Sequence, residues 1–343
     1  MAKHLVTGGA GFIGSSLVAR LLSRCETVTV FDNLSRFGVD ANLQWLKTLD
    51  CDSWLTFING DVRDADAVWS AAREADVIYH LAAQTAVTTS VENPRTDFEI
   101  NAIGTLNLLE AARHSDRNPV LIYASTNKVY GGMDDVGVME QETRYSYRDR
   151  PLGIDETMPL DFHSPYGCSK GTGDQYTRDY ARIYGVRSVV ARQSCIYGPR
   201  QFGTEDQGWL AWFFIAAAQD KQPTVYGDGK QVRDLLYIDD LLDFYDLAVQ
   251  NIERAKGQIY NVGGGIENSM SVWIELEPHL DRLFQKKVKV DYASWRPGDQ
   301  RIYVSDIRRA EADLGWQPKT KLGEGLGKLY DWVQELLASP VNR

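Results

Sequence analysis

The stretch Leu5-Val-Thr-Gly8-Gly9-Ala-Gly11-Phe-Ile-Gly14 places four glycines between a short apolar run and a segment of helical spacing. Glycines in a strand-to-helix turn permit a sharp bend and let a pyrophosphate approach the backbone closely. The amino end of the following helix faces such phosphates with the positive end of its dipole. The stretch therefore predicts a dinucleotide-binding turn, and the alternative is a glycine-rich turn without a ligand. We expect cofactor contacts from Gly8, Gly11, Phe12, Ile13 and Gly14.

Short apolar runs alternate with helical segments through the first half of the chain. Strand-like runs cover residues 4–7, 27–31, 54–58, 77–81, 120–124 and 188–191. Helical spacing covers residues 15–22, 65–73, 101–113 and 164–184. This alternation predicts an α/β, Rossmann-like doubly wound fold, in which helices cover both faces of a parallel sheet.

The pattern changes after about residue 191, where Gly198-Pro-Arg, Gln222-Pro and Gly227-Asp-Gly are turn signals. Residues 258–262 are predicted to form a last strand that returns to the main sheet. Residues 131–161 are predicted to form a polar loop with small elements near the site. We expect a dinucleotide-binding domain of residues 1–190 plus about 234–264. A smaller, discontinuous substrate-binding domain, about 191–233 and 265–343, would cover the carboxyl edge of the sheet.

An acidic residue follows the second run at the position where ribose is recognised in such folds. Asp32 lies 18 residues after Gly14, and its carboxylate can accept hydrogen bonds from an adenosine ribose. It would repel a 2′-phosphate, which favours NAD over NADP, although Arg36 lies close by. Further cofactor contacts are expected near the carboxyl ends of the runs and on a following helix. The full set is Asp32, Asn33, Ser35, Arg36, Asp61, Val62, Leu81, Ala82, Ala83, Gln84 and Asn101.

Tyr166-Gly-Cys-Ser-Lys170 puts a phenol and an ammonium on one face of a helix. A free phenol has a pKa near ~10, so it needs a neighbouring cation to act as a base at neutral pH. Lys170 and a cationic nicotinamide would both favour the phenolate, and Lys170 could also hold the nicotinamide ribose. Thr126, at the end of the fifth run, offers a hydroxyl to the reacting oxygen. We expect Thr126, Tyr166 and Lys170 to be catalytic, with Tyr166 and Lys170 also contacting the cofactor.

The spacing of this pair is not specific by itself. Tyr226 and Lys230 repeat it, but they span Gly227-Asp-Gly and cannot form a regular helix. For Tyr166 the alternative is an ordinary tyrosine of an amphipathic helix. The glycine turn and the hydroxyl at the end of the fifth run argue against that alternative.

Composition excludes several classes of partner. A net charge of −10 argues against nucleic acid and anionic membranes as partners. No run approaches the ~18–20 apolar residues of a membrane span. The four cysteines (Cys25, Cys51, Cys168 and Cys195) lack paired spacing, which favours free thiols in a reducing cytoplasm over disulfides or a zinc site. We expect no metal and read His80 as structural.

These motifs, in this order, resemble the extended short-chain dehydrogenase/reductase superfamily over essentially the whole chain. The matching residues are Gly8, Gly11, Gly14, Asp32, Thr126, Tyr166 and Lys170. The resemblance implies tightly bound NAD, a nucleotide-diphosphate sugar as substrate and an arginine-bearing second domain. It also implies a homo-oligomer, dimer or tetramer, in which helices at 101–113 and 164–184 pack between subunits.

Longer runs are similar to one subgroup, the CDP-paratose (CDP-tyvelose) 2-epimerases. They include Phe31-Asp-Asn-Leu-Ser-Arg36, Ser125-Thr-Asn-Lys-Val-Tyr-Gly131, Leu160-Asp-Phe-His-Ser-Pro-Tyr166 and Asp206-Gln-Gly-Trp209. The similarity implies that the substrate contacts Thr126, Asn127, Lys128, His163, Ser194, Cys195, Gln201, Arg233 and Arg296. Cys195 departs from the wider superfamily, where many members have a substrate-contacting Asn, so the contact on the phosphate side stays open. Taken alone, Arg233 or Arg296 could be a solvated surface arginine.

The expected activity is NAD-dependent C2 epimerisation of a CDP-hexose, through transient oxidation to a 2-keto sugar. The substrate could be of the CDP-paratose type or a less deoxygenated sugar such as CDP-glucose. A 4-epimerase and a 4,6-dehydratase are the enzymatic alternatives. Dehydratases of this fold place an acidic pair after the triad hydroxyl, whereas this chain has Asn127 and Lys128 there. A non-catalytic NAD-sensing regulator is the alternative from another class.

Overall fold

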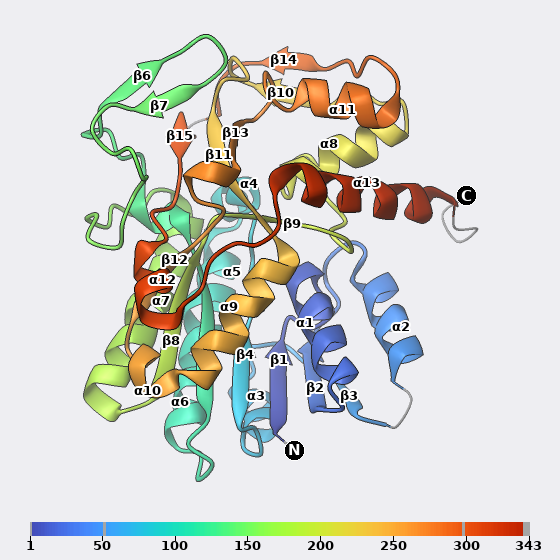
Figure 1. Cartoon of the computed structure of the whole chain (residues 1–343). Helices are drawn as coiled ribbons and strands as arrows, with labels where there is room; N and C mark the ends of the chain where they lie inside the picture. Colours follow the sequence, from blue (N-terminus) through green and yellow to red (C-terminus); the bar gives the residue numbers. More distant parts are fainter. Residues whose placement is uncertain (1, 51–52, 297–298, 339–343) are drawn as a thin grey trace.

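The computed structural model describes residues 2–50, 53–296 and 299–338. Its main sheet has seven parallel strands in the order β12-β8-β5-β4-β1-β2-β3 (Figure 1). This confirms the expected doubly wound fold, including the last strand from the 258–262 run. The strands are β1 Lys3–Thr7, β2 Thr27–Asp32, β3 Leu55–Asn59, β4 Val77–His80, β5 Val120–Thr126, β8 Arg187–Gln193 and β12 Ile259–Val262.

Helices cover both faces of this sheet because successive strand residues point to opposite sides. In β1, Leu5 packs in the cluster that includes α3, α6 and α7, and Val6 in the cluster that includes α1 and α9. The helices around the sheet are α1 Phe12–Ser23, α2 Val39–Leu49, α3 Ala65–Ala72, α4 Val87–Glu92, α5 Pro94–Phe98, α6 Gly104–Arg113, α7 Ser164–Tyr184, α9 Ile238–Gln250, α10 Ile252–Ala255 and α12 Arg308–Leu314. The predicted helix 101–113 begins within a π-helical turn, Glu99–Ile103, and continues as α6.

Helix α7 has the predicted bounds, and local chemistry explains both ends. Pro165 lies in its first turn, where a missing N–H costs nothing. Gly185 follows its last residue with a φ of 73°, the left-handed conformation that commonly ends helices. Tyr166 and Lys170 therefore lie in the first two turns of one continuous helix.

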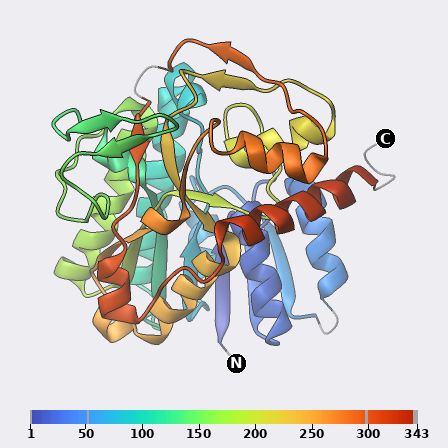
Figure 2. The ribbon, with the colours of Figure 1, turned by 45° about the horizontal axis from the view of Figure 1, so that its top comes forward.

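The other elements of the second half of the chain lie above the carboxyl ends of the main-sheet strands (Figures 1 and 2). Strand β11 pairs there with β9, β13 and β15, and two further strand pairs are β10–β14 and β6–β7. The hairpin β6–β7 forms within the predicted loop 131–161. The bounds are β6 Val138–Glu140, β7 Tyr145–Tyr147, β9 Cys195–Tyr197, β10 Thr224–Tyr226, β11 Val232–Tyr237, β13 Ser269–Ser271, β14 Asp291–Ala293, β15 Ile302–Tyr303, α8 Trp209–Ala218, α11 Glu277–Phe284 and α13 Leu322–Ala338.

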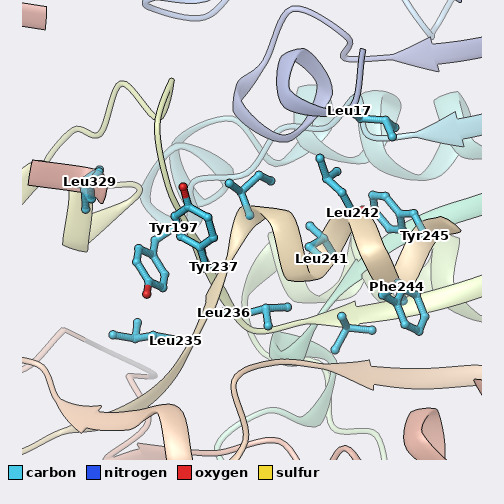
Figure 3. Close-up of a cluster of buried hydrophobic side chains, with 14 of the residues drawn as sticks. Leu17, Tyr197, Leu235, Leu236, Tyr237, Leu241, Leu242, Phe244, Tyr245 and Leu329 are labelled. Atoms are coloured by element: carbon cyan, nitrogen blue, oxygen red, sulfur yellow. The ribbon is translucent and has the colours of Figure 1, made fainter. Parts of the chain in front are cut away.

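One hydrophobic cluster joins the second sheet to the main sheet. Figure 3 shows Leu236 of β11 near Leu241 of α9, and Leu242 of α9 near Leu17 of α1. Leu235, the preceding residue of β11, belongs to the same cluster. All five side chains are buried. The two halves therefore share apolar packing, and the residue ranges of the two predicted domains stay a prediction.

A buried ion pair links α7 to the main sheet. Arg192 of β8 donates to both carboxylate oxygens of Asp174, with Nε and Nη2 each at 2.9 Å. Ser125 of β5 donates to the same carboxylate at 2.7 Å. Arg192 is 1% exposed and Asp174 is fully buried. Removing either partner of such a pair leaves the other as a buried charge without a counter-charge, which is strongly destabilising.

Replacing Asp174 with Asn should lower the free energy of unfolding by about 3–5 kcal/mol, because Arg192 would stay buried without a counter-charge. Urea titration followed by circular dichroism measures the change. Glu74→Gln, which breaks an exposed pair with Lys3, should change stability little. Equal effects of the two substitutions would contradict this account.

Candidate active site

A cavity of about 220 Å³ opens at the carboxyl ends of β1, β2 and β4, above the glycine turn. It brings together most of the predicted cofactor contacts, although they come from separate segments. Those lining it are Gly8, Gly11, Phe12, Ile13, Gly14, Asp32, Asn33, Ser35, Arg36, Asp61, Val62, Leu81, Ala82, Ala83, Tyr166 and Lys170.

The glycine turn leaves no room for side chains. Gly8 has a φ of 69°, and a Cβ there would lie 2.7 Å from the backbone nitrogen of Ala82. A Cβ on Gly14 would lie 2.2 Å from the carbonyl oxygen of Gly8, so α1 packs directly on β1. A Cβ on Gly11 would approach only that carbonyl oxygen, at 3.1 Å, and Gly11 lines the cavity. The turn therefore forms a cradle that a side chain would fill, which suits a dinucleotide pyrophosphate.

Asp32 is held at the end of β2 by backbone donors. Its carboxylate accepts from Ala10 N at 3.0 Å and from Leu34 N at 2.9 Å. Burial raises the pKa of Asp32, and these hydrogen bonds oppose the rise. Each oxygen keeps a free lone pair, so the carboxylate can accept ribose hydroxyls and would repel a phosphate. This geometry suits NAD.

Gln84 and Asn101 are predicted cofactor contacts that do not line the cavity. Asn101 is buried in the π-helical turn, where it accepts from Gln84 N and donates to Gln84 O and to Ser169 Oγ. It therefore joins the loop after β4 to α7. The cavity is also lined by residues that the sequence did not suggest as cofactor contacts: Phe31, Val39, Gly60, Thr85, Ile100, Ala124, Ser125, Gln193 and Gln207. Of these, Gln193 could have been found from its place after a strand run.

Two of the predicted catalytic residues, Tyr166 and Lys170, line this cavity, and the third, Thr126, follows Ser125 of the lining. The side chains of Tyr166 and Thr126 lie close enough to interact. Lys170 is 4% exposed, and its ammonium lies 4.3 Å from the centre of the Tyr123 ring. Burial raises the pKa of Tyr166, while the Thr126 side chain opposes the rise. The protein alone therefore holds the phenol protonated, and phenolate formation needs a further positive charge.

Burial also lowers the pKa of two basic side chains, Lys170 and His80. It lowers the pKa of Lys170 to about 7, although Asp174 and Asp97 favour its charged form. It lowers the pKa of His80 to about 3. His80 lies between the hydroxyls of Thr7 and Thr105, at 2.9 Å and 3.0 Å, as suits a structural histidine.

Two of the predicted substrate contacts, Arg233 and Lys128, meet at Asp299. Arg233 Nη2 donates to Asp299 Oδ1 at 2.7 Å, and Lys128 Nζ lies 3.9 Å from the same oxygen. Cys195 lies close enough to Lys128 and Arg233 to interact electrostatically with both. Burial opposes ionisation of Asp299, but Arg233 and Lys128 hold its pKa below the usual value. Asp299 was not among the predicted site residues.

The remaining predicted substrate contacts have other partners in the structure. Ser194 donates to Asp234 in the core, and Gln201 donates to the carbonyl of Ile196. Arg296 stacks on Tyr226 with its guanidinium 3.9 Å from the ring centre. The side chains that complete the predicted set are Asn127, which is 8% exposed and follows Thr126, and His163, which is 48% exposed and pairs with Asp161.

The family model described as GDP-mannose 4,6 dehydratase matches residues 5–329. The chain belongs to this family of NAD-dependent epimerases and dehydratases. A CDP-paratose 2-epimerase of Salmonella typhi is 45% identical over 97% of this chain and all of that protein. A UDP-glucose 4-epimerase of Mycolicibacterium smegmatis is 34% identical over 97% of this chain and 98% of that protein.

Solved structures of the family share the whole fold. The UDP-glucuronic acid 4-epimerase of Bacillus cereus, in complex with UDP-glucuronic acid and NAD, superposes with a TM-score of 0.82. It is 29% identical and covers 97% of this chain and 99% of that chain. Within the described part of this chain, no helix is both long and apolar enough to cross a membrane.

Stability of the nucleotide-free protein should rise between pH 7 and 9. The unfolded chain keeps a proton on Lys170 up to its ordinary pKa of 10.5, whereas the folded chain loses that proton near pH 7. The slope from this group is at most about 1.4 kcal/mol per pH unit. Urea titrations at several pH values should show that Lys170→Met removes this part of the rise. An unchanged slope in the variant would contradict the lowered pKa.

Proposed function

We propose that this chain epimerises C2 of a CDP-hexose, of the CDP-paratose type or a less deoxygenated sugar such as CDP-glucose. The observation that carries the proposal is that Tyr166 and Lys170, one turn apart on α7, line the dinucleotide cavity while the Thr126 side chain lies close to the phenol. The CDP-paratose 2-epimerase at 45% identity supports both the base and the carbon. NAD is the cofactor, and when bound it supplies a hydride acceptor and donor together with a positive charge that favours the phenolate.

Each catalytic side chain has one task in this proposal. Tyr166 takes the proton from the C2 hydroxyl and later returns it. Thr126 donates a hydrogen bond to the reacting oxygen, which stabilises the developing charge. Lys170 holds the nicotinamide ribose, and its protonated form adds positive charge near the phenol. The flat 2-keto sugar turns in the pocket between the two hydride transfers, so the product differs only at C2.

The residues after Thr126 argue against a 4,6-dehydratase. Elimination needs an acid to protonate the leaving hydroxyl, and the two positions are Asn127 and Lys128. Lys128 points towards Asp299 and Gln300 of the second half. A 4-epimerase needs no such acid, so product analysis must distinguish C2 from C4 inversion.

We further propose a homo-oligomer that forms through α7 and its neighbours. Exposed apolar side chains gather on α5, the π-helical turn and α7: Phe98, Ile103, Tyr176, Ile183 and Tyr184. Helix α7 contacts α5 and α6, so these elements adjoin. Light scattering after gel filtration should give a dimer or tetramer, and Ile183→Glu should shift it towards monomer. A wild-type monomer would contradict this proposal.

The free thiols of Cys25, Cys168 and Cys195 support a reducing cytoplasm as the location, which cell fractionation can test. Cys51, the fourth cysteine, lies outside the described residues. A nucleotide-diphosphate sugar fits the charge of the site, because Arg233 and Lys128 are positive groups within an acidic chain. No group of three or more metal-binding side chains comes together within the described ranges.

Purified protein incubated with CDP-, UDP-, GDP- and dTDP-sugars should invert C2 of a CDP-sugar only, as read by carbohydrate NMR. A substrate deuterated at C2 should keep its label, because the hydride returns from the cofactor to the same carbon. Loss of deuterium to solvent, or inversion at C4, would contradict the proposed reaction.

In the same assay Tyr166→Phe should lower kcat by about 10²–10⁴-fold, the usual contribution of a positioned acid–base group. NAD measured after gel filtration should stay bound, since the cradle of Gly8, Gly11 and Gly14 is intact. A regulator that only senses NAD would show no turnover in the wild-type protein either.

A further inference from the structure

The Lys128 ammonium is a cation with unused hydrogen-bonding capacity. Its contacts among the described residues are long, 3.5 Å to Gln300 Oε1 and 3.9 Å to Asp299 Oδ1. An ammonium has three donors, and a charge-assisted hydrogen bond is ordinarily about 2.7–2.9 Å long. The side chain is 29% exposed. An anionic ligand could therefore gain short bonds here that the protein does not provide.

The backbone of Lys128 lies beside the redox site. Lys128 N donates to Thr126 Oγ1 at 3.2 Å within the turn that follows β5, Asn127–Tyr130. The Thr126 side chain in turn lies close to Tyr166. The position of Lys128 is thus coupled to the hydroxyl that would hold the reacting oxygen of the sugar.

The Lys128 side chain turns from there towards Arg233. Both cations contact one carboxylate oxygen, Asp299 Oδ1, so they are neighbours that share a single counter-charge. Cys195, the third group near them, is a weak donor and does little for a phosphate. Two cations and one carboxylate leave a net positive charge that suits a phosphate with more than one negative charge.

The geometry of the sugar relates the position of the bound phosphate to the carbon that reacts. In a nucleotide-diphosphate sugar the β-phosphate is bonded through oxygen to C1, and C2 is the adjacent carbon. C4 lies on the opposite side of the ring. An enzyme that oxidises C2 must therefore hold the β-phosphate close to the hydroxyl that binds the reacting oxygen. An enzyme that oxidises C4 holds the phosphate about a ring's width away.

We propose that Lys128, together with Arg233, binds the β-phosphate beside Thr126 and that this contact presents C2, rather than C4, to the redox site. The proposal rests on the proposed function and adds a determinant of the reacting carbon. On binding, the phosphate takes the place of Asp299 as the partner of both cations. Lys128 is then a specificity residue that contacts the substrate, and Thr126 and Tyr166 remain the groups that act on C2.

Comparison of CDP with CMP isolates the β-phosphate, because CMP lacks it. Calorimetric titration of the NAD-loaded protein should show that Lys128→Met weakens CDP binding by about tenfold or more, the size expected for a lost charge-assisted bond. CMP binding should stay within about twofold of wild type. Lys289→Met, which removes an exposed lysine of the second half, is the matched control and should leave both nucleotides unchanged.

Unchanged CDP affinity, or equal losses for CDP and CMP, would overturn the β-phosphate contact. With the CDP-sugar, the variant should also lower kcat for C2 inversion, and a raised KM with unchanged kcat would overturn the role in presenting C2. Bound NAD and the melting temperature show whether the variant folds, and Lys128→Gln replaces it if it does not. If wild type prefers another nucleoside diphosphate, the proposed base is wrong, yet that diphosphate and its monophosphate still test Lys128.

Discussion

The buried pair between Asp174 and Arg192 is the constraint on which the site depends. It joins α7, which bears Tyr166 and Lys170, to the strand β8. Ser125 adds β5 to the same pair, and Thr126 is the next residue on that strand. A phenol and a hydroxyl from elements about forty residues apart can therefore hold one geometry. Because both ions are out of water, the pair tolerates little displacement, and this rigidity is what an acid–base step requires.

Acidic and cationic side chains lie in different parts of the site. Asp32 and Asp61 lie where a dinucleotide meets the main sheet, and α1 offers the positive end of its dipole to the pyrophosphate. The second half instead offers Arg233, which Lys128 approaches from the end of β5. The cofactor and the proposed substrate both contain a diphosphate, so separate cationic features would hold each diphosphate in its own place. The acidic net charge of the chain does not conflict with anionic ligands, because the relevant charges are local.

Much of the first half was predictable because its patterns are local. Helix α7 begins and ends as predicted, since Pro165 and Gly185 mark its ends. Most of the predicted cofactor contacts line one cavity, because the carboxyl ends of parallel strands meet at one edge. Gln84 and Asn101 do not line it, because they satisfy each other and Ser169 instead. A polar side chain can hydrogen-bond within the protein or contact a ligand. Which of the two it does depends on neighbouring side chains that sequence spacing does not reveal.

The alternation of strands and helices, the glycine turn, the acidic residue at the end of β2 and the helix with Tyr166 and Lys170 all follow from the sequence. Each of these features is recognised from residues that are close together along the chain. Which distant residues share a partner follows only from three-dimensional packing. Asp299 meets both Lys128 and Arg233, and Gln207 joins the cofactor cavity, because packing brings β11 and the segments around it over the main sheet. Long-range contacts of this kind come from the shape of the assembled core, and no local pattern encodes them.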